Sequence, residues 1–366
     1  MRVLITGSNG FIGKNLCVYL SELKDIEVIK YSRDNTESEL DSLCSEVDFV
    51  IHLAGINRPE NDSEFTTGNE MLTKSLCDSL SKTGRKIPII LSSSIQAVGN
   101  NLYGKSKLAS EEAVEMYSKS TGSLVYIYRL PNVFGKWCKP NYNSAVSTFC
   151  YNILNDLDIK ISDPNIELNL VYIDDVVKEF SSRLFSEKTA VKVDVKPIYK
   201  ITLSELVETI KSFRGTDLLT IGNVGVGLTR CLYSTYLSYK KPEMFSYDLL
   251  EHSDDRGVFV EILKTASSGQ FSFFTAHPGI TRGGHYHHSK NEKFLVVKGN
   301  ATFKFRNIIS NEAYEISTTG KTPEVVETIP GWAHDITNVG DDEMIVMLWA
   351  NEIFDEKLPD TYTSRL

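Results

Sequence analysis

Residues 3–13 read VLITGSNGFIG, which is a short apolar run, three glycines at a GxxGxxG spacing and the start of a helical pattern. We expect a strand at Val3–Thr6, a tight loop, and a helix at Gly13–Glu22. The same alternation continues with apolar runs at Glu27–Tyr31, Phe49–Leu53, Ile87–Ser92 and Val125–Leu130. Strands that alternate with helices form parallel sheets covered on both faces. The first half is therefore predicted to be a doubly wound α/β domain.

The glycine loop predicts a dinucleotide site of Rossmann type. Glycine allows the backbone to approach a pyrophosphate, which free N–H groups at the helix N-terminus then hold. The predicted cofactor contacts in this loop are Gly7, Asn9, Gly10, Phe11, Ile12 and Gly13. At the end of the second strand, Ser32 and Arg33 stand where an NAD site commonly places an acid, and a cation favours a 2′-phosphate. The pattern predicts NADP(H); Asp34, one position later, leaves NAD open.

A second motif offers a proton donor. Tyr103 and Lys107 have a YxxxK spacing, which puts both side chains on one face of a helix. A lysine ammonium near a phenol lowers the tyrosine pKa, so that Tyr103 could donate a proton near neutral pH. A lone match of this spacing is more often an exposed pair on a helix. Here, however, the serines at 92–94 precede it at a predicted strand end, where a hydroxyl could bind a carbonyl oxygen.

Taken together, these motifs resemble those of the extended short-chain dehydrogenases/reductases, a family that acts largely on nucleotide sugars. The shared motifs, in order, are the glycine loop, HLAG at 52–55, the serines at 92–94, YxxxK, RLPNVFG at 129–135 and YIDDV at 172–176. The resemblance places Ser94, Tyr103 and Lys107 at the catalytic positions, with Ser93 as the competitor of Ser94. It also implies that Leu53 and Ala54 contact the cofactor and that Arg129 and Asn132 contact the substrate.

Past about Ser246 the pattern changes to short strands broken by Gly, Pro, Asn and Asp, which is typical of an all-β sandwich or barrel. The expected strands are Val258–Leu263, Gln270–Thr275, Glu292–Val297, Ala301–Phe305 and Glu343–Trp349.

Residues 279–299 fit the pattern G-x5-H-x-H-x4-E-x6-G. Because side chains two apart on a strand face the same way, His285 and His287 can converge on one ion. Glu292 and His334 would join them from two other strands. Three imidazoles and one carboxylate suit a divalent metal with an open position, for which we expect zinc, although these ligands accept several ions.

This histidine motif resembles that of the cupin family, although the second cupin motif, around Pro330-Gly331 and His334, departs from the pattern. The segment DRGVFVE at 255–261 is further similar to the sugar-3,5-epimerase branch of the cupins. The alternative is a cupin barrel whose histidines only form internal hydrogen bonds.

The two halves predict an extended reductase domain with a substrate lobe at 1–243 and a metal-binding cupin domain at 247–366. This order resembles the bifunctional reductase–cupin enzymes of bacterial capsular polysaccharide synthesis, on the route to UDP-N-acetyl-L-fucosamine. The resemblance implies C3 epimerisation of a UDP-2-acetamido-2,6-dideoxy-4-hexulose by the cupin. Reduction at C4 with NADPH would then give a UDP-2-acetamido-2,6-dideoxy-L-talose. Epimerisation must come first, because the 4-ketone acidifies the C3 hydrogen and reduction removes that acidity.

Several points stay open. The group that removes the C3 proton is not identified; Tyr286, Lys290, Lys293 and Asp335 are candidates by nearness to the histidine motif. One alternative function is a single-activity 4-keto reductase whose cupin is structural, and another is a non-enzymatic regulator that binds NADP and a sugar. A dehydratase is disfavoured, because Ile95 and Gln96 follow Ser94 where that chemistry usually recruits acids.

Composition sets the remaining bounds. A chain of 366 residues favours two domains, and 41% hydrophobic with 24% charged residues indicates a soluble globular protein. A net charge of -9 without a basic run disfavours nucleic acid as a partner. The six scattered cysteines indicate a reducing compartment. No signal peptide and no apolar run of about 20 residues is present. We therefore predict a cytoplasmic enzyme without a membrane partner and, since cupins often pair through their sheets, a homodimer.

Overall fold

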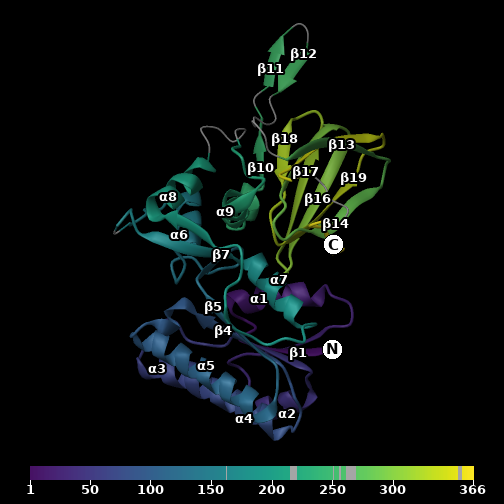
Figure 1. Cartoon of the computed structure of the whole chain (residues 1–366). Coiled ribbons are helices and arrows are strands. Elements are labelled where there is room, and N and C mark those ends of the chain that lie inside the picture. Colours follow the sequence, from purple (N-terminus) through teal and green to yellow (C-terminus); the bar gives the residue numbers. More distant parts are fainter. Residues whose placement is uncertain (162, 215–220, 250, 255–256, 261–268, 353–356) are drawn as a thin grey trace. The chain divides into compact units, whose positions relative to one another are not determined.

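The computed structural model describes residues 1–161, 163–214, 221–249, 251–254, 257–260, 269–352 and 357–366. The chain forms two compact units, shown in Figure 1. Unit 1 comprises Met1–Lys139 and Leu168–Ile201, and unit 2 comprises Pro140–Glu167 and Thr202–Leu366. The predicted division at 243–247 falls inside unit 2, so the predicted substrate lobe is shared between the units. The domain boundary itself stays a prediction.

A six-stranded parallel sheet forms the centre of unit 1, with the order β2-β1-β3-β4-β5-β8. Its strands are β1 (Arg2–Thr6), β2 (Glu27–Tyr31), β3 (Phe49–His52), β4 (Ile89–Ser94), β5 (Val125–Leu130) and β8 (Ala190–Val193). The chain leaves β1 toward β2 on one side and returns to β3 on the other. In such sheets ligands bind at the carboxyl ends of the strands beside this reversal. The sheet confirms the predicted doubly wound α/β fold.

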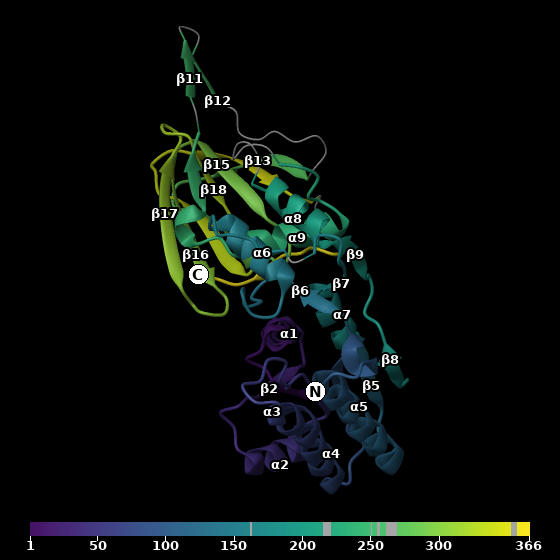
Figure 2. The same cartoon turned by 90° about the vertical axis from the view of Figure 1, so that its left-hand side faces the viewer.

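Helices cover both faces of this sheet. They are α1 (Phe11–Ser21), α2 (Glu37–Glu46), α3 (Ser63–Phe65), η1 (Thr66–Met71), α4 (Leu72–Lys82), η2 (Ile95–Val98), α5 (Leu102–Thr121) and α7 (Ile173–Arg183). Figures 1 and 2 show α2 and α4 on one face and α1 on the other. The buried cluster on the first face joins Leu40 and Leu76 of α2 and α4 to strand residues such as Val50 and Ile89. Burial of these apolar side chains stabilises the layered arrangement.

A smaller three-stranded sheet has the order β6-β7-β9. Its strands are β6 (Asn132–Phe134), β7 (Glu167–Tyr172) and β9 (Tyr199–Thr202). β6 and β7 pair in parallel, with Asn132 opposite Leu170. This pairing brings the predicted substrate residue Asn132 beside the strand that leads into α7.

The described part of unit 2 contains four helical segments and a β-rich region. The helical segments are α6 (Ala145–Leu154), α8 (Leu203–Ser212), α9 (Gly227–Leu237) and η3 (Pro242–Met244). Two five-stranded sheets face each other, with the orders β10-β18-β15-β20-β13 and β17-β16-β19-β14-β21, and a hairpin pairs β11 with β12. Aromatic side chains, among them Phe294, Phe303 and Trp332, fill the space between the two sheets. This architecture confirms the predicted cupin barrel.

The strands of this region have the following bounds: β10 (Ser246–Asp248), β11 (Glu251–Asp254), β12 (Gly257–Val260), β13 (Gln270–Ala276), β14 (Thr281–Tyr286), β15 (Glu292–Lys298), β16 (Asn300–Asn307), β17 (Ala313–Thr319), β18 (Glu324–Glu327), β19 (Trp332–Asn338), β20 (Met344–Ala350) and β21 (Tyr362–Thr363). Four of the five expected strands match to within one or two residues. The end of the fifth, at 261–263, and residues 255, 256 and 261 of the DRGVFVE segment lie outside the described residues. None of the described helices is long and apolar enough to cross a membrane.

Candidate functional site

The loop between β1 and α1 packs so closely that side chains would not fit at the positions its glycines occupy. Gly7 has a φ of +69°, and its N–H donates to the carbonyl of Tyr31 at 2.9 Å. A Cβ on Gly7 would lie 2.7 Å from the nitrogen of Ala54, and one on Gly13 would lie 2.3 Å from the carbonyl oxygen of Gly7. Gly10 is the N-cap of α1, with no side chain capping the helix. The free N–H groups of this helix end can therefore hold a phosphate.

The other predicted loop contacts surround this turn. Asn9 and Gly10 are exposed, whereas Phe11 and Ile12 are half-buried at the start of α1. Leu53 and Ala54 reach the loop because the N–H of Leu53 donates to the carbonyl of Thr6, and that of Ala54 to the Thr6 hydroxyl, both at 3.2 Å. The structure thus brings the predicted cofactor residues after β1 and β3 to one edge of the sheet.

At the end of β2, the arginine is available to a ligand. The hydroxyl of Ser32 donates to the carboxylate of Asp34 at 3.0 Å, which engages the nearby acid. Arg33 is exposed and forms no hydrogen bond or ion pair with any residue in the described part of the chain. This arrangement fits the predicted preference for a 2′-phosphate.

The predicted catalytic residues converge at the carboxyl end of β4. Ser94 ends the strand, and its hydroxyl accepts from the N–H of Gln96 at 3.1 Å; it also lies close enough to Tyr103, in the first turn of α5, to lower the pKa of that phenol. Ser93 is directed elsewhere, since its hydroxyl donates to the buried Glu111 at 2.5 Å. Of the two competing serines, Ser94 is therefore the one beside the tyrosine.

The pKa of Tyr103 is shifted in the direction opposite to the one predicted from its spacing to Lys107. Burial raises the pKa of Tyr103, and the hydrogen bond from Ser94 opposes this. The buried Lys107 amine donates to the carbonyl of Ser92 at 2.7 Å and is not among the groups that shift Tyr103. The expected lowering of the Tyr103 pKa by Lys107 is thus not seen. Burial lowers the pKa of Lys107 itself to about 8, while the charge of Glu111 opposes that shift.

Glu111 was not among the predicted residues, and it pairs with Arg129. It is fully buried, and its carboxylate accepts from Nε and Nη2 of Arg129 at 2.9 and 2.6 Å. Arg129, near the end of β5, pairs with this carboxylate in the middle of α5, and the substrate contact predicted for Arg129 stays a prediction. The sequence signal was available: Glu111 stands four residues after Lys107, one helical turn further along the same face.

A buried amide also connects the motifs. Oδ1 of Asn69 accepts from the N–H of Ile56 at 2.7 Å, and its Nδ2 donates to the hydroxyl of Ser106 at 2.9 Å. It thereby ties the segment after β3 to α5, between the tyrosine and lysine of the YxxxK motif. No local pattern marked Asn69. The predicted substrate residue Asn132 is exposed, and its amide donates to the carbonyl of Asn169 at 3.3 Å.

His52 belongs to the HLAG motif, but its contacts lie inside the fold. It is buried between Thr6 and Thr73, whose hydroxyls lie 2.6 and 2.9 Å from its two ring nitrogens. Burial lowers its pKa to about 3, so the ring is neutral. The histidine thus fastens β3 to β1 and α4.

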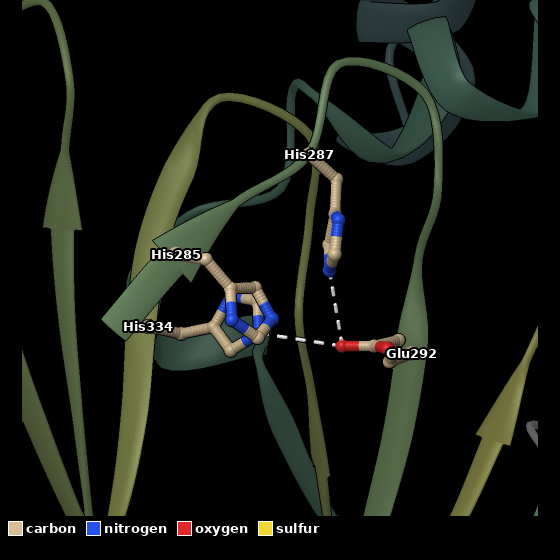
Figure 3. A group of neighbouring side chains, drawn as sticks. All are labelled: His285, His287, Glu292 and His334. Carbon is tan, nitrogen blue, oxygen red and sulfur yellow. Dashed lines mark hydrogen bonds and ion pairs between the residues drawn. The ribbon is translucent and has the colours of Figure 1, made fainter. Parts of the chain in front are cut away.

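In unit 2, the four predicted metal ligands converge, as Figure 3 shows. His285 comes from β14, His287 follows it, Glu292 begins β15 and His334 lies on β19. Their ligand atoms all lie within 4.8 Å of one another. Oε2 of Glu292 is 3.2 Å from Nε2 of His287 and 3.3 Å from Nε2 of His334. The register explains the convergence, since His285 pairs directly with His334 across the two strands.

The electrostatics of this cluster fit a cation. Burial, reinforced by the neighbouring His334 and His287, lowers the pKa of His285 to about 3, and burial also lowers that of His334. Burial alone would raise the pKa of Glu292, but the adjacent histidines hold it well below its usual range. Nε2 of His334 is buried and forms no hydrogen bond with any described residue. Neutral imidazoles at His285 and His334, an ionised carboxylate and an unsatisfied nitrogen are what a divalent ion requires.

The structure separates the four candidates for the C3 base. Tyr286 packs on Tyr362 and His288, on the other side of β14 from His285. Lys293 donates to the hydroxyl of Tyr247 at 3.0 Å, and Asp335 follows His334 on a strand and so faces away from it. The Lys290 amine lies 4.0 Å from Oε1 of Glu292. Among the four, Lys290 is the one whose polar group lies beside the metal ligands.

Comparison with known proteins supports both halves of the chain. Residues 3–184 match the NAD dependent epimerase/dehydratase family, and residues 252–362 match the polysaccharide biosynthesis C-terminal domain. The UDP-2-acetamido-2,6-beta-L-arabino-hexul-4-ose reductase of Pseudomonas aeruginosa is 57% identical over 364 residues, covering 99% of this chain and 98% of that protein.

Solved structures also resemble this chain, one over its whole length and another over its first part. The capsular polysaccharide assembling protein CapF from Staphylococcus aureus aligns over 100% of both chains, with a TM-score of 0.68 and 44% identity. The UDP-glucuronic acid 4-epimerase from Bacillus cereus in complex with NAD covers 59% of this chain and 85% of its own, with a TM-score of 0.54 and 20% identity. This second likeness shows the fold of the first part alone.

Proposed function

This chain belongs to the family of the UDP-2-acetamido-2,6-beta-L-arabino-hexul-4-ose reductase and CapF, and from that membership we propose a two-step conversion of a UDP-linked sugar. Its cupin domain epimerises C3 of a UDP-2-acetamido-2,6-dideoxy-4-hexulose. Its reductase domain then reduces the C4 ketone and gives a UDP-2-acetamido-2,6-dideoxy-L-talose. The coarser activity, reduction of a UDP 4-keto sugar with a nicotinamide cofactor, is the part that the relatives support directly.

In the reductase site, the chain's own residues handle the carbonyl oxygen. The nicotinamide cofactor supplies the hydride that C4 receives. The hydroxyl of Ser94 donates a hydrogen bond to O4, and Tyr103 passes its phenolic proton to O4 as the ketone becomes an alcohol. The raised pKa of Tyr103 keeps the phenol protonated at neutral pH, which suits a proton donor. NADP(H) is proposed over NAD because Arg33 is exposed without an acidic partner.

In the cupin site, the residues are arranged to hold a metal ion. His285, His287, Glu292 and His334 are the proposed ligands, and zinc is the proposed ion. A divalent ion there supplies Lewis-acid stabilisation of negative charge on an oxygen. The reaction removes a proton from C3, leaves an enolate across C3 and C4, and returns a proton to the opposite face. The chain is proposed to work as a homodimer.

The observation that carries the proposal is the meeting of Ser94, Tyr103 and Lys107 at the carboxyl edge of the sheet. Ketone reduction needs a hydroxyl, a phenol and an amine of this kind. A Cβ on Gly55, which follows Ala54 beside the glycine loop, would lie 3.6 Å from Nζ of Lys107. A reductase with a structural cupin shares this site but lacks C3 exchange. A regulator that only binds its ligands lacks both activities.

The test is NADPH consumption with an enzymatically prepared UDP-4-keto-6-deoxy-N-acetylhexosamine in D2O, followed by mass analysis of the sugar. We expect NADPH oxidation in the wild type and its loss in Tyr103→Phe, with deuterium entering C3 in both. In His334→Ala, deuterium uptake at C3 is expected to vanish. Absence of NADPH oxidation in a protein shown to bind the cofactor would contradict the reductase, and unchanged exchange in His334→Ala would leave the cupin structural.

A further inference from the structure

The C-terminal segment of the chain lies along the strand that leads to the histidine motif. β21 pairs with β14, so that Thr363 is opposite His285 and Tyr362 is opposite Tyr286. The N–H of Ser364 donates to the carbonyl of Gly284 at 2.8 Å. Figure 1 marks the C-terminus beside β14. Residues that are some seventy positions away in the sequence are thereby brought against the ligand-bearing strand.

Asp360, just before β21, holds the turn that connects two of the proposed ligands. Its Oδ1 accepts from the N–H of His288 at 2.9 Å. Its Oδ2 accepts from the N–H groups of Ser289 and Lys290, both at 2.7 Å, and from the Ser289 hydroxyl at 2.9 Å. One half-buried carboxylate therefore satisfies four donors of the turn between His287 and Glu292.

The same residue also contacts the ring of His287. The main-chain carbonyl of Asp360 accepts a hydrogen bond from Nδ1 of His287. A carbonyl can only accept, so Nδ1 carries a proton, and Nε2 is the ring nitrogen left to bind an ion. Nε2 is the nitrogen that faces Glu292 at 3.2 Å. A partner of this kind fixes the tautomer and ring orientation of a metal-bound histidine.

We propose that Asp360 is a positioning residue of the cupin metal site, holding the turn at 288–290 with its carboxylate and the His287 ring with its carbonyl. The inference rests on the metal site in the proposed function. Asparagine has nearly the same shape, but it offers one acceptor oxygen, and its amide group would meet N–H donors. Asp360→Asn therefore loosens the turn and the His287 ring together.

The test measures zinc affinity of the full chain by competition with a fluorescent chelator. Loss of such a supporting contact typically weakens metal binding about 10- to 100-fold, and we expect this for Asp360→Asn. The matched control is Asp341→Asn, an exposed carboxylate of the same barrel that changes the net charge equally. Equal zinc affinity in Asp360→Asn and the wild type overturns the inference. Failure of the wild type to bind zinc overturns the metal site in the proposed function instead.

A second measurement reports on the ring itself. In zinc-loaded protein with ¹⁵N-labelled histidine, the wild type should show His287 with its proton on Nδ1 and Nε2 bound to the ion, and Asp360→Asn a mixture of ring states. If Asp360→Asn does not fold, Ser289→Ala removes one of the four donors to the carboxylate. A lost hydrogen bond of this strength predicts zinc binding weaker by about two- to tenfold. Unchanged affinity in Ser289→Ala would then overturn the inference.

Discussion

The ionisation of Lys107 illustrates how single residues set the chemistry of the reductase site. A buried amine tends to lose its proton, and the pKa of Lys107 falls to about 8. Glu111, one turn further along α5, opposes this loss, although its carboxylate is also engaged by Ser93 and Arg129. The charge state of the lysine therefore depends on a side chain outside the proposed catalytic set.

Replacing the Glu111 carboxylate with a neutral amide tests whether the pKa of Lys107 depends on it. In Glu111→Gln the pKa of Lys107 should fall below about 8, so the amine loses its proton at a lower pH. The alkaline limb of the pH profile of kcat should then move toward neutral pH, with activity at pH 8 lower by roughly two- to tenfold. Steady-state rates between pH 6 and 10 measure this. Glu112→Gln, exposed and next in sequence, is the control and should keep the wild-type profile.

The same change leaves Arg129 without its buried partner. Breaking a buried ion pair from one side costs about 3 kcal/mol or more, so a lower Tm should accompany the altered profile. A lower Tm with an unchanged pH profile would show that Glu111 is structural only.

At the scale of elements, the two faces of strand β15 have different roles. On one side of β15, Glu292 contributes to the metal ligands. On the other side, Lys293 lies 3.0 Å from Glu327 of β18, which also forms an ion pair with Lys240 beyond α9. Because neighbouring residues of a strand point to opposite faces, one strand serves both the metal site and a structural ion-pair network. This network ties the segment after α9 to the barrel.

Glu327 should make the barrel sensitive to acid. Burial alone would raise its pKa, but the two lysines lower it to about 2. A carboxylate with a depressed pKa contributes stability above its unfolded pKa near 4.5 and loses it as the pH falls toward 2. Glu327→Gln should lower the stability at pH 7 by about 3 kcal/mol and flatten the acid limb of Tm against pH.

Thermal melts between pH 2.5 and 7 check this expectation. The control is Glu324→Gln, on the same strand but outside the ion-pair network, which should melt as the wild type does. Equal acid sensitivity in wild type and Glu327→Gln would contradict the role given to this carboxylate.

At the scale of the whole molecule, the two sets of functional residues belong to different units. The glycine loop, Ser94, Tyr103 and Lys107 lie in unit 1, and the four metal ligands lie in unit 2. Such a division lets each step of the proposed conversion have its own site. The order of the steps still follows from the chemistry, because reduction removes the ketone that makes C3 acidic.

Ligand removal tests this separation. A ligand that binds only the folded state stabilises it, and the gain appears where the ligand binds. We expect a zinc chelator to increase hydrogen exchange at residues 285–292 and 360–364 while leaving residues 7–13 and 102–107 unchanged. NADPH should protect the latter two segments and leave the former two unchanged. Exchange that changes in both units with either ligand would contradict the separation.

The sequence by itself determined the features that repeat locally. Alternation of strands and helices predicted the parallel sheet, the glycine spacing predicted the turn at Gly7, and strand alternation predicted that His285 and His287 share a face. Each of these depends only on the geometry of neighbouring residues, which a fixed spacing encodes. The site roles built on these motifs stay predictions, although the structure brings most of those residues together.

The tertiary structure alone decided which partner each side chain has. It directed Arg129 to Glu111, aimed the Lys107 amine at a main-chain carbonyl, and placed Lys290 beside the metal ligands. It also brought Asp360 against a turn about seventy residues earlier in the chain. A spacing tells which face of an element a residue occupies, whereas its partner comes from the packing of elements that are distant in sequence. The physical reason is that burial and pairing are settled only when those elements meet.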